Sequence, residues 1–317
     1  MRLSPLFKLV LALLCQTLVA QAKYILKEDF FDDAGFFSHF MFIDYDDPTG
    51  GTVQYVNKAT AEQQGLIRST SNSAWLGADS TNILAADEKR KSIRLHSYND
   101  YTHMLLIVQF NSIPVGCGSW PAFWTVGHVW PTRGEIDIIE GVHNQAANRM
   151  SLHTTAGCAT NGSGNGILNP TSGNADCGSG CSFDSADPAS YSRTTAMGGG
   201  VWAMEWNSDG ISIWHWETDK LGNSNVLTDS PDVSTFGIPQ MNVPAGPNCD
   251  VDAHFMSNNV LLNWDFCGTW AGDQSEWDKS GCKSAEFPTC PDYVRGNPRA
   301  FEGMGWDVRY MKVFVEG

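Results

Sequence analysis

The sequence predicts an all-β protein, a β-jelly-roll sandwich of two antiparallel sheets. Short runs of β-branched and aromatic residues recur along the chain, and Gly and Pro turn signals separate them. Helical patterning is nearly absent, because the best helical segment, residues 61–68, is short and contains Gly65. Many short strands with few helices are typical of a sandwich or a jelly roll.

The strands of this sandwich are predicted from the apolar runs. We expect the first and the last of them to come together and close the sheets. The predicted strands cover residues 24–30, 92–97, 103–110, 135–140, 210–217, 259–266 and 306–315.

Residues 157–199 are rich in Gly, Asn and Ser and carry no periodic pattern. They read either as a linker between two domains or as a long loop inside one. Cys158, Cys177 and Cys181 lie within this segment, which favours a loop held by disulfides. We therefore expect residues 23–317 to form a single catalytic domain.

Residues 1–22 have the character of a secretory signal peptide. Arg2 and Lys8 make the start basic, an apolar run follows over residues 9–14, and small residues come before the remainder of the chain. The apolar run is too short to span a bilayer as a membrane anchor. The sequence therefore predicts cleavage after Ala20 or Ala22 and a secreted, extracellular protein.

Cysteine content and charge narrow the class of protein further. Eight of the nine cysteines lie beyond residue 22, and an even number in a secreted chain predicts up to four disulfides whose pairing stays open.

Without Arg2 and Lys8, 18 of the 20 basic residues remain against 35 acidic ones, a net charge near −17. This charge argues against nucleic-acid and membrane partners and favours a neutral or cationic one. We expect a monomer.

The most informative segment reads RGEIDIIEGVH, residues 133–143. Side chains alternate along a strand, so Glu135 and Asp137 share one face, whereas Glu140 points to the other. One extra residue between Asp137 and Glu140, a β-bulge, would return Glu140 to the acidic face. If the three acids act together, such a bulge is required.

Paired carboxylates of this kind suit retaining glycoside hydrolysis. That reaction uses a carboxylate nucleophile and a carboxylic acid about 5–5.5 Å apart. A straight strand places residues five apart at about 16 Å, so the sheet must curve into a concave cleft. Three neighbouring carboxyls do not all ionise near neutral pH. Asp137 would help to separate the pKa of the nucleophile from the pKa of the proton-donating acid.

The same residues resemble the signature of glycoside hydrolase family sixteen, E-x-D-x-x-E with aliphatic residues at x, in its bulged, laminarinase-type form found in fungal endo-1,3(4)-β-glucanases. The flanking segments GCGSWPAFWTVG (116–127), LHTTAGC (152–158) and DFCGTWAG (265–272) agree. The resemblance implies a β-jelly roll and retaining hydrolysis of internal β-glucan bonds. It also implies that Glu135 is the nucleophile, Asp137 its assistant and Glu140 the acid/base.

A calcium site is the competing interpretation of the acids. Calcium takes six to eight oxygen ligands, and this segment offers three carboxylates without an EF-hand loop. DYDDPTGG (44–51) resembles the start of such a loop, but Tyr55 occupies its twelfth position. We therefore expect no catalytic metal and no cofactor, although a structural calcium ion is compatible with the sequence.

Substrate-binding residues are predicted around the acids. Aromatic faces suit the apolar surface of a sugar ring, and an indole N–H can donate to a hydroxyl. By resemblance, Arg94 and His153 hydrogen-bond sugar hydroxyls, and Asn57 is expected along the cleft. The tryptophans expected near the cleft are Trp120, Trp124, Trp130, Trp270 and Trp277.

The sequence thus predicts a secreted endo-glucanase that cleaves β-1,3 bonds, with mixed β-1,3/1,4-glucans as further substrates. The linkage preference comes from the resemblance alone. Two alternatives stay open: a glucan transglycosylase on the same fold, and a non-catalytic glucan-binding protein. The second is disfavoured because both Glu135 and Glu140 are present.

Overall fold

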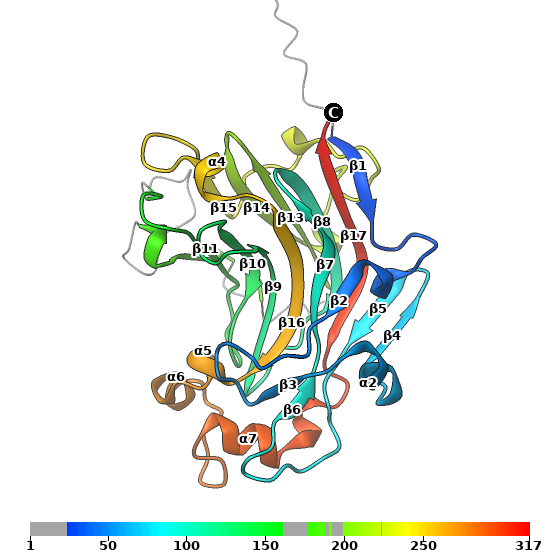
Figure 1. Cartoon of the computed structure of the whole chain (residues 1–317), viewed down its shortest axis with the longest axis vertical. Helices are drawn as coiled ribbons and strands as arrows, with labels where there is room; N and C mark the ends of the chain where they lie inside the picture. The colour runs from blue at the N-terminus through cyan, green and yellow to red at the C-terminus, as the bar shows by residue number, and fades with distance from the viewer. Residues whose placement is uncertain (1–23, 161–175, 188–189, 192–198, 223) are drawn as a thin grey trace, which may run out of the picture.

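The structure of the protein is a computed structural model, which describes residues 24–160, 176–187, 190–191, 199–222 and 224–317. These residues form two large antiparallel sheets that pack face to face, together with a few short helices (Figure 1). This architecture confirms the predicted jelly-roll sandwich. The predicted signal peptide lies outside the described residues.

The first sheet has eight strands in the order β15-β14-β13-β8-β17-β5-β4, with β1 pairing with β17 beside this path. The pairing of β1 with β17 joins the first and last strands, as the sequence predicted. Its strands are β1 (Tyr24–Asp29), β4 (Ile67–Thr70), β5 (Ser73–Leu76), β8 (Met104–Ser112), β13 (Gly200–Asn207), β14 (Gly210–Glu217), β15 (Met241–Pro244) and β17 (Trp306–Glu316).

The second sheet has seven strands in the order β12-β11-β10-β9-β16-β7-β2. A separate parallel pair joins β3 (Val53–Tyr55) to β6 (Arg90–Ser92). The strands of the second sheet are β2 (Phe40–Phe42), β7 (Arg94–Tyr101), β9 (Ser119–Gly127), β10 (Glu135–Glu140), β11 (Arg149–His153), β12 (Cys181–Asp184) and β16 (Asn258–Phe266).

Short helices lie at the ends of the sandwich, and α5, α6 and α7 gather at one of them (Figure 1). In the described ranges, no helix has the length and apolar character needed to cross a bilayer. The α-helices are α2 (Lys58–Gln63), α4 (Val251–His254), α5 (Gly268–Ala271), α6 (Gln274–Lys279) and α7 (Cys290–Gly296). The 3-10 helices are η1 (Phe36–His39), η2 (Cys177–Ser179), η3 (Thr218–Lys220), η4 (Val233–Thr235) and η5 (Pro298–Phe301).

Each of the seven predicted ranges overlaps a strand, and the predictions at 135–140 and 210–217 match β10 and β14 residue for residue. Sequence patterning missed nine strands of the described residues: β2, β3, β4, β5, β9, β11, β12, β13 and β15. The predicted strand at 92–97 is instead divided at Ile93 between β6 and β7, which belong to different sheets. A helix that the pattern did not predict, α2, forms over Lys58–Gln63. Its start is fixed by Asn57, whose side chain accepts a hydrogen bond from the Thr60 amide.

The main core lies between the two sheets. Phe110 of β8 contacts Phe123 of the opposite sheet at 5.4 Å between ring centroids, and it contacts Trp306 at 4.9 Å. The odd-numbered residues Leu105 and Ile107 of the same strand face outward into a second apolar cluster. Both faces of β8 are therefore covered, which explains its continuous apolar run.

Four disulfides connect the described residues, the number that the sequence predicted as a maximum. One of them, Cys158–Cys249, ties the start of the Gly-rich segment to the loop before α4, so this segment is attached at its beginning as expected. The pairs are Cys117–Cys282, Cys158–Cys249, Cys177–Cys181 and Cys267–Cys290.

We expect Phe110→Ala to lower the free energy of unfolding by about 3–5 kcal/mol, because it leaves a cavity between the two sheets. Urea denaturation followed by tryptophan fluorescence measures this change as a lower midpoint at an unchanged slope. Tyr98→Ala is the control, since Tyr98 is 62% exposed and should change stability by no more than about 0.5 kcal/mol. Equal losses in the two variants would contradict this account of the core.

Candidate active site

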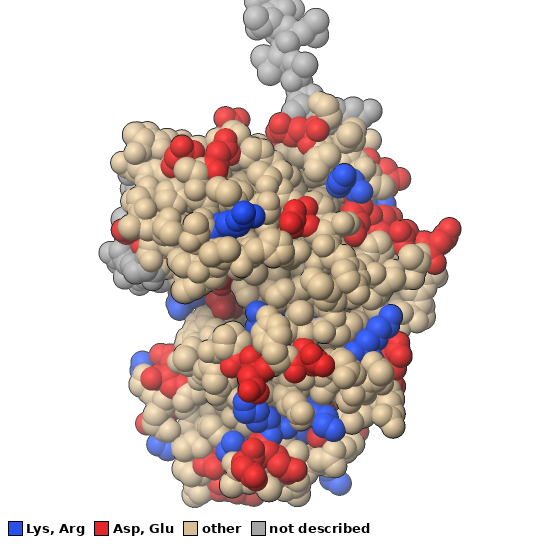
Figure 2. Space-filling view, in the orientation of Figure 1, with Lys and Arg blue, Asp and Glu red and all other residues tan. Residues whose placement is uncertain are grey.

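The seven-stranded sheet carries a cleft of about 800 Å³ on the face that points away from the core. Along β9, Trp120, Ala122, Trp124 and Val126 line this cleft, whereas the residues between them face inward. Figure 2 shows one side of the molecule hollowed between an upper and a lower part, with acidic and basic atoms inside the hollow. The cleft therefore opens to solvent and follows from simple strand alternation.

Strand β10 departs from regular pairing at the position that the sequence predicted. Asp137 of β10 lies opposite Trp124 of β9, and Ile139 lies opposite the next residue of β9, Phe123. Ile138 is therefore the extra residue of a β-bulge. The register against β11 also shifts between Asp137 and Glu140. The bulge returns Glu140 to the face of the other two acids, and all three carboxylates line the cleft.

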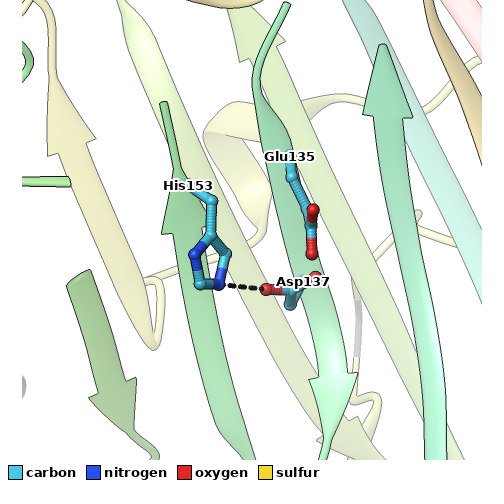
Figure 3. Close-up of side chains that lie close together, drawn as sticks. All are labelled: Glu135, Asp137 and His153. Carbon is cyan, nitrogen blue, oxygen red and sulfur yellow. Dashed lines mark ion pairs between the residues drawn. The ribbon is translucent and has the colours of Figure 1, made fainter. Parts of the chain in front are cut away.

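Glu135, Asp137 and His153 form a compact cluster on β10 and β11, and their side chains point toward one another (Figure 3). One carboxylate oxygen of each acid and one ring nitrogen of the histidine all lie within 4.8 Å of one another. His153 lies directly opposite Glu135 in the strand register, and its Nε2 is 3.4 Å from Asp137 Oδ2. His153 lines the cleft beside the acids, and its predicted hydrogen bond to a sugar hydroxyl stays a prediction.

Burial raises the pKa of all three carboxyl groups. For Glu135, the neighbouring Asp137 raises the pKa further, while His153 lowers it. For Asp137, which is only 3% exposed, Glu140 adds to the effect of burial on the pKa. Proton loss from one acid therefore disfavours proton loss from the next, and the cluster retains protons that isolated acids would release.

Two tryptophans lower the pKa of the outer acids. The Trp120 indole N–H donates to Glu140 Oε1 at 2.9 Å and so opposes the burial-driven rise in the pKa of Glu140. The nearby Trp130 side chain lowers the pKa of Glu135. Trp130 is 62% exposed, which leaves most of its surface free at the rim of the cleft.

Arg94 and Trp124 form one wall of the cleft as a fixed unit. The guanidinium carbon of Arg94 lies 5.2 Å from the centre of the Trp124 ring, and its Nε donates to His96 Nε2 at 3.2 Å. Burial, with the nearby Arg94, lowers the pKa of His96 to about 3, so this imidazole is neutral and accepts the bond. The Trp124 indole N–H donates to Asn263 Oδ1 at 2.7 Å and is therefore not free for a sugar hydroxyl.

Three predicted substrate-binding residues, Asn57, Trp270 and Trp277, do not line the cleft. The predictions for Asn57 and Trp277 are wrong. Asn57 caps helix α2, and its side chain accepts a hydrogen bond from the Thr60 amide. The residue is exposed, but it lies outside the lining of the cleft. Trp277 is fully buried and packs against His143 and Tyr293, because α6 turns its apolar face toward the core. Trp270 is intermediate, since it supports Trp120 edge-on at 5.8 Å but does not itself line the cleft.

Sequence reasoning missed several cleft residues. Asn259, Asn263 and Asp265 of β16 line the cleft, as do His96 of β7 and Thr49. The polar residues at odd positions in NVLLNWDF carried the signal, because alternation places Asn263 and Asp265 on one face. Burial, then the nearby carboxyl of Asp47, raises the pKa of Asp265 well above its usual range.

The only grouping of at least three potential metal ligands in the described part of the chain is Glu135, Asp137 and His153. These side chains are within reach of one another, which suits proton sharing as well as metal binding. In the acidic segment 44–51, Asp47 Oδ2 accepts bonds from the Thr49 and Gly51 amides and so closes a turn. The expectation of no catalytic metal and no cofactor, with a structural calcium ion compatible with the sequence, stays a prediction.

Comparison with known proteins agrees with this geometry. Residues 40–314 match the model of the XgeA-like catalytic domain of glycoside hydrolase family 16. An endo-1,3(4)-β-glucanase of Arthroderma benhamiae is 35% identical over 94% of this chain and 66% of its own length. The corresponding xgeA enzyme of Emericella nidulans is 36% identical over 94% of this chain and 48% of its own length. The chain thus spans about half to two thirds of the length of these curated relatives.

Solved structures give the same result. Laminarinase 16A of Phanerochaete chrysosporium, determined with β-glucans in donor and acceptor sites, has a TM-score of 0.85 at 34% identity. The alignment covers 92% of this chain and all of that structure. An elongating family 16 β-1,3-glucosyltransferase has a TM-score of 0.83 at 35% identity, with the same coverage. From the motif, the cleft and these matches, the chain belongs to glycoside hydrolase family 16.

Proposed function

We propose that the protein is a retaining endo-glycosidase that hydrolyses internal β-1,3 bonds of glucans, and mixed β-1,3/1,4-glucans as well. The single observation that carries this proposal is the bulge at Ile138, which places Glu135, Asp137 and Glu140 together in an open cleft. The relatives named endo-1,3(4)-β-glucanase support the linkage. An open cleft suits cleavage within a chain, because the polymer can lie across the site.

In the proposed first step, a carboxylate oxygen of Glu135 attacks the anomeric carbon and the bond to the leaving oxygen breaks. Glu140 gives its proton to that oxygen, so the departing sugar leaves as an alcohol and Glu140 becomes a carboxylate. In the second step, Glu140 takes a proton from water, whose oxygen attacks the anomeric carbon and releases Glu135. The raised pKa of Glu140 supports the presence of a proton for the first step.

Asp137 is proposed to assist the nucleophile. Its burial and the nearby Glu140 raise its pKa well above the usual range, so it retains a proton that an isolated aspartic acid would release. A protonated Asp137 donates a hydrogen bond to Glu135, which stabilises the ionised form of that neighbour. Its contact with His153 fixes the orientation of the carboxyl group.

The remaining cleft residues are proposed to bind the sugar rings. Trp130 offers an exposed indole face at the rim of the cleft, and Trp120 and Trp124 contribute ring surface to its lining. Arg94 and His153 supply polar groups that suit hydroxyls. The net charge of −15 for the whole chain is compatible with a neutral polysaccharide.

We also propose that the protein acts outside the cell. The four disulfides of the described residues support this location, because disulfides persist in oxidising compartments. The predicted signal peptide at residues 1–22 supports it as well.

Glucosyl transfer is the second candidate function. The observation that favours it is the similarity to the elongating β-1,3-glucosyltransferase. In that reaction the hydroxyl of a second glucan, rather than water, attacks the intermediate on Glu135. Both reactions share the first step, so the same acids serve in either case. A non-catalytic glucan-binding protein is less well supported, because both glutamates are intact and share one face.

A product profile on laminarin, lichenan and a β-1,4-glucan tests the proposed function. We expect a ladder of short oligosaccharides from laminarin, with Glu135→Gln at least about a thousandfold slower because the nucleophile is lost. Products longer than the donor would indicate transfer. No products on any substrate, with glucan binding intact, would indicate a binding protein.

Glu140→Ala should lower the rate on laminarin by about 10²–10⁴-fold, because the leaving oxygen is no longer protonated. An aryl glucoside with an activated leaving group needs no proton and should react much faster than laminarin in this variant. Azide should restore turnover and yield a glycosyl azide, because it attacks the intermediate without a general base. The absence of rescue by either route would contradict the assigned role.

Two displacements at the anomeric carbon leave its configuration unchanged. We therefore expect the first product of laminarin hydrolysis to be the β-anomer, which ¹H NMR detects before mutarotation. A product that first appears as the α-anomer would show that water attacks directly and that Glu135 is not a nucleophile.

A further inference from the structure

Asn148 lies just before β11, is fully buried and does not line the cleft. Its side-chain nitrogen donates to the Ile138 carbonyl at 2.8 Å, and its side-chain oxygen accepts from the Glu140 amide at 3.0 Å. One side-chain amide thus connects both sides of the β-bulge.

These two backbone groups belong to the part of β10 that regular pairing does not satisfy. Ile138 and Ile139 have no register partner on β11, and Ile138 has none on β9. A backbone carbonyl and amide buried there still require partners. Asn148 supplies one acceptor and one donor, and so takes the place of a peptide unit of the neighbouring strand.

The asparagine is itself held rigidly. Its backbone N–H donates to Ser190 Oγ at 2.8 Å, and its carbonyl accepts from the Ser185 amide at 2.7 Å. With its side-chain contacts, this residue is fixed at four points. It can therefore fix the backbone from which the Glu140 side chain extends.

We propose that Asn148 is a positioning residue that holds the bulge and thereby aims Glu140 at the leaving oxygen of the substrate. The inference rests on the proposed function, since it concerns the acid/base of that reaction. Glu135 precedes the bulge and pairs in regular register with β11, so its position does not depend on this side chain. Loss of Asn148 should therefore impair protonation more than nucleophilic attack.

The test compares Asn148→Ala with wild type on two substrates, laminarin and a 2,4-dinitrophenyl β-laminaribioside. The first needs proton donation to the leaving oxygen and the second does not. We expect kcat/KM on laminarin to fall about 10²-fold, as for a small misplacement of a catalytic group. We expect kcat/KM on the dinitrophenyl substrate to change less than about 3-fold, because this quantity reports the first step and not the second, in which Glu140 acts as a base. KM for laminarin should stay within about 3-fold, because no residue of the cleft wall is altered.

Tyr191→Phe is the matched control. Its hydroxyl is buried and donates to the Gly141 carbonyl at 3.1 Å, so the variant loses a hydrogen bond to the same segment without touching the bulge. It should lower the thermal midpoint to a similar degree while the ratio of the two rates stays as in wild type. Lower stability alone should therefore leave the ratio of the two rates unchanged.

If Asn148→Ala does not fold, Asn148→Ser provides the same comparison. The Ser hydroxyl keeps a polar group at the buried position, but it is shorter than the amide and has one oxygen in place of the separate donor and acceptor that connect the Ile138 carbonyl and the Glu140 amide. Equal losses on both substrates, or no loss on either, would overturn the positioning role. An inactive wild type would instead count against the proposed function.

Discussion

The site depends on one irregularity in strand β10. An antiparallel strand sends alternate side chains to opposite faces, and residues five apart cannot share a face without an extra residue. Ile138 is that residue, and it divides β10 into a part that carries Glu135 and Asp137 and a part that carries Glu140. Without it, Glu140 would point into the core between the sheets, where an acid is strongly disfavoured.

The rest of the fold supports this local distortion. The face of β10 opposite the acids contributes Ile136 and Ile139 to the core, so inward packing fixes the register on both sides of the bulge. The flanking strands β9 and β11 bring Trp120 and His153 next to the acids. The bulge is therefore held from the core, from the neighbouring strands and from Asn148.

The same arrangement accounts for the electrostatics. Asp137 and Glu140 raise the pKa of Glu135, and Glu140 raises the pKa of Asp137, in each case beyond the effect of burial. The neighbouring groups differ, because the Trp120 indole donates to Glu140 while Trp130 lowers the pKa of Glu135. Chemically similar acids thus receive different surroundings, which is the condition for giving them different roles.

The sequence by itself determined the fold class, the positions of seven strands including β10, the acidic cluster and the need for a bulge, because alternation and turn signals are local properties. It did not determine the disulfide pairs, which join cysteines up to 165 residues apart. Nor could it separate Trp277 in the core from Trp130 at the rim, since both are tryptophans near turns. Asn57 and Asn148 show the same limit. Both are asparagines at the start of an element, yet one caps an exposed helix and the other spans the bulge, because only tertiary packing decides which backbone groups lie within reach.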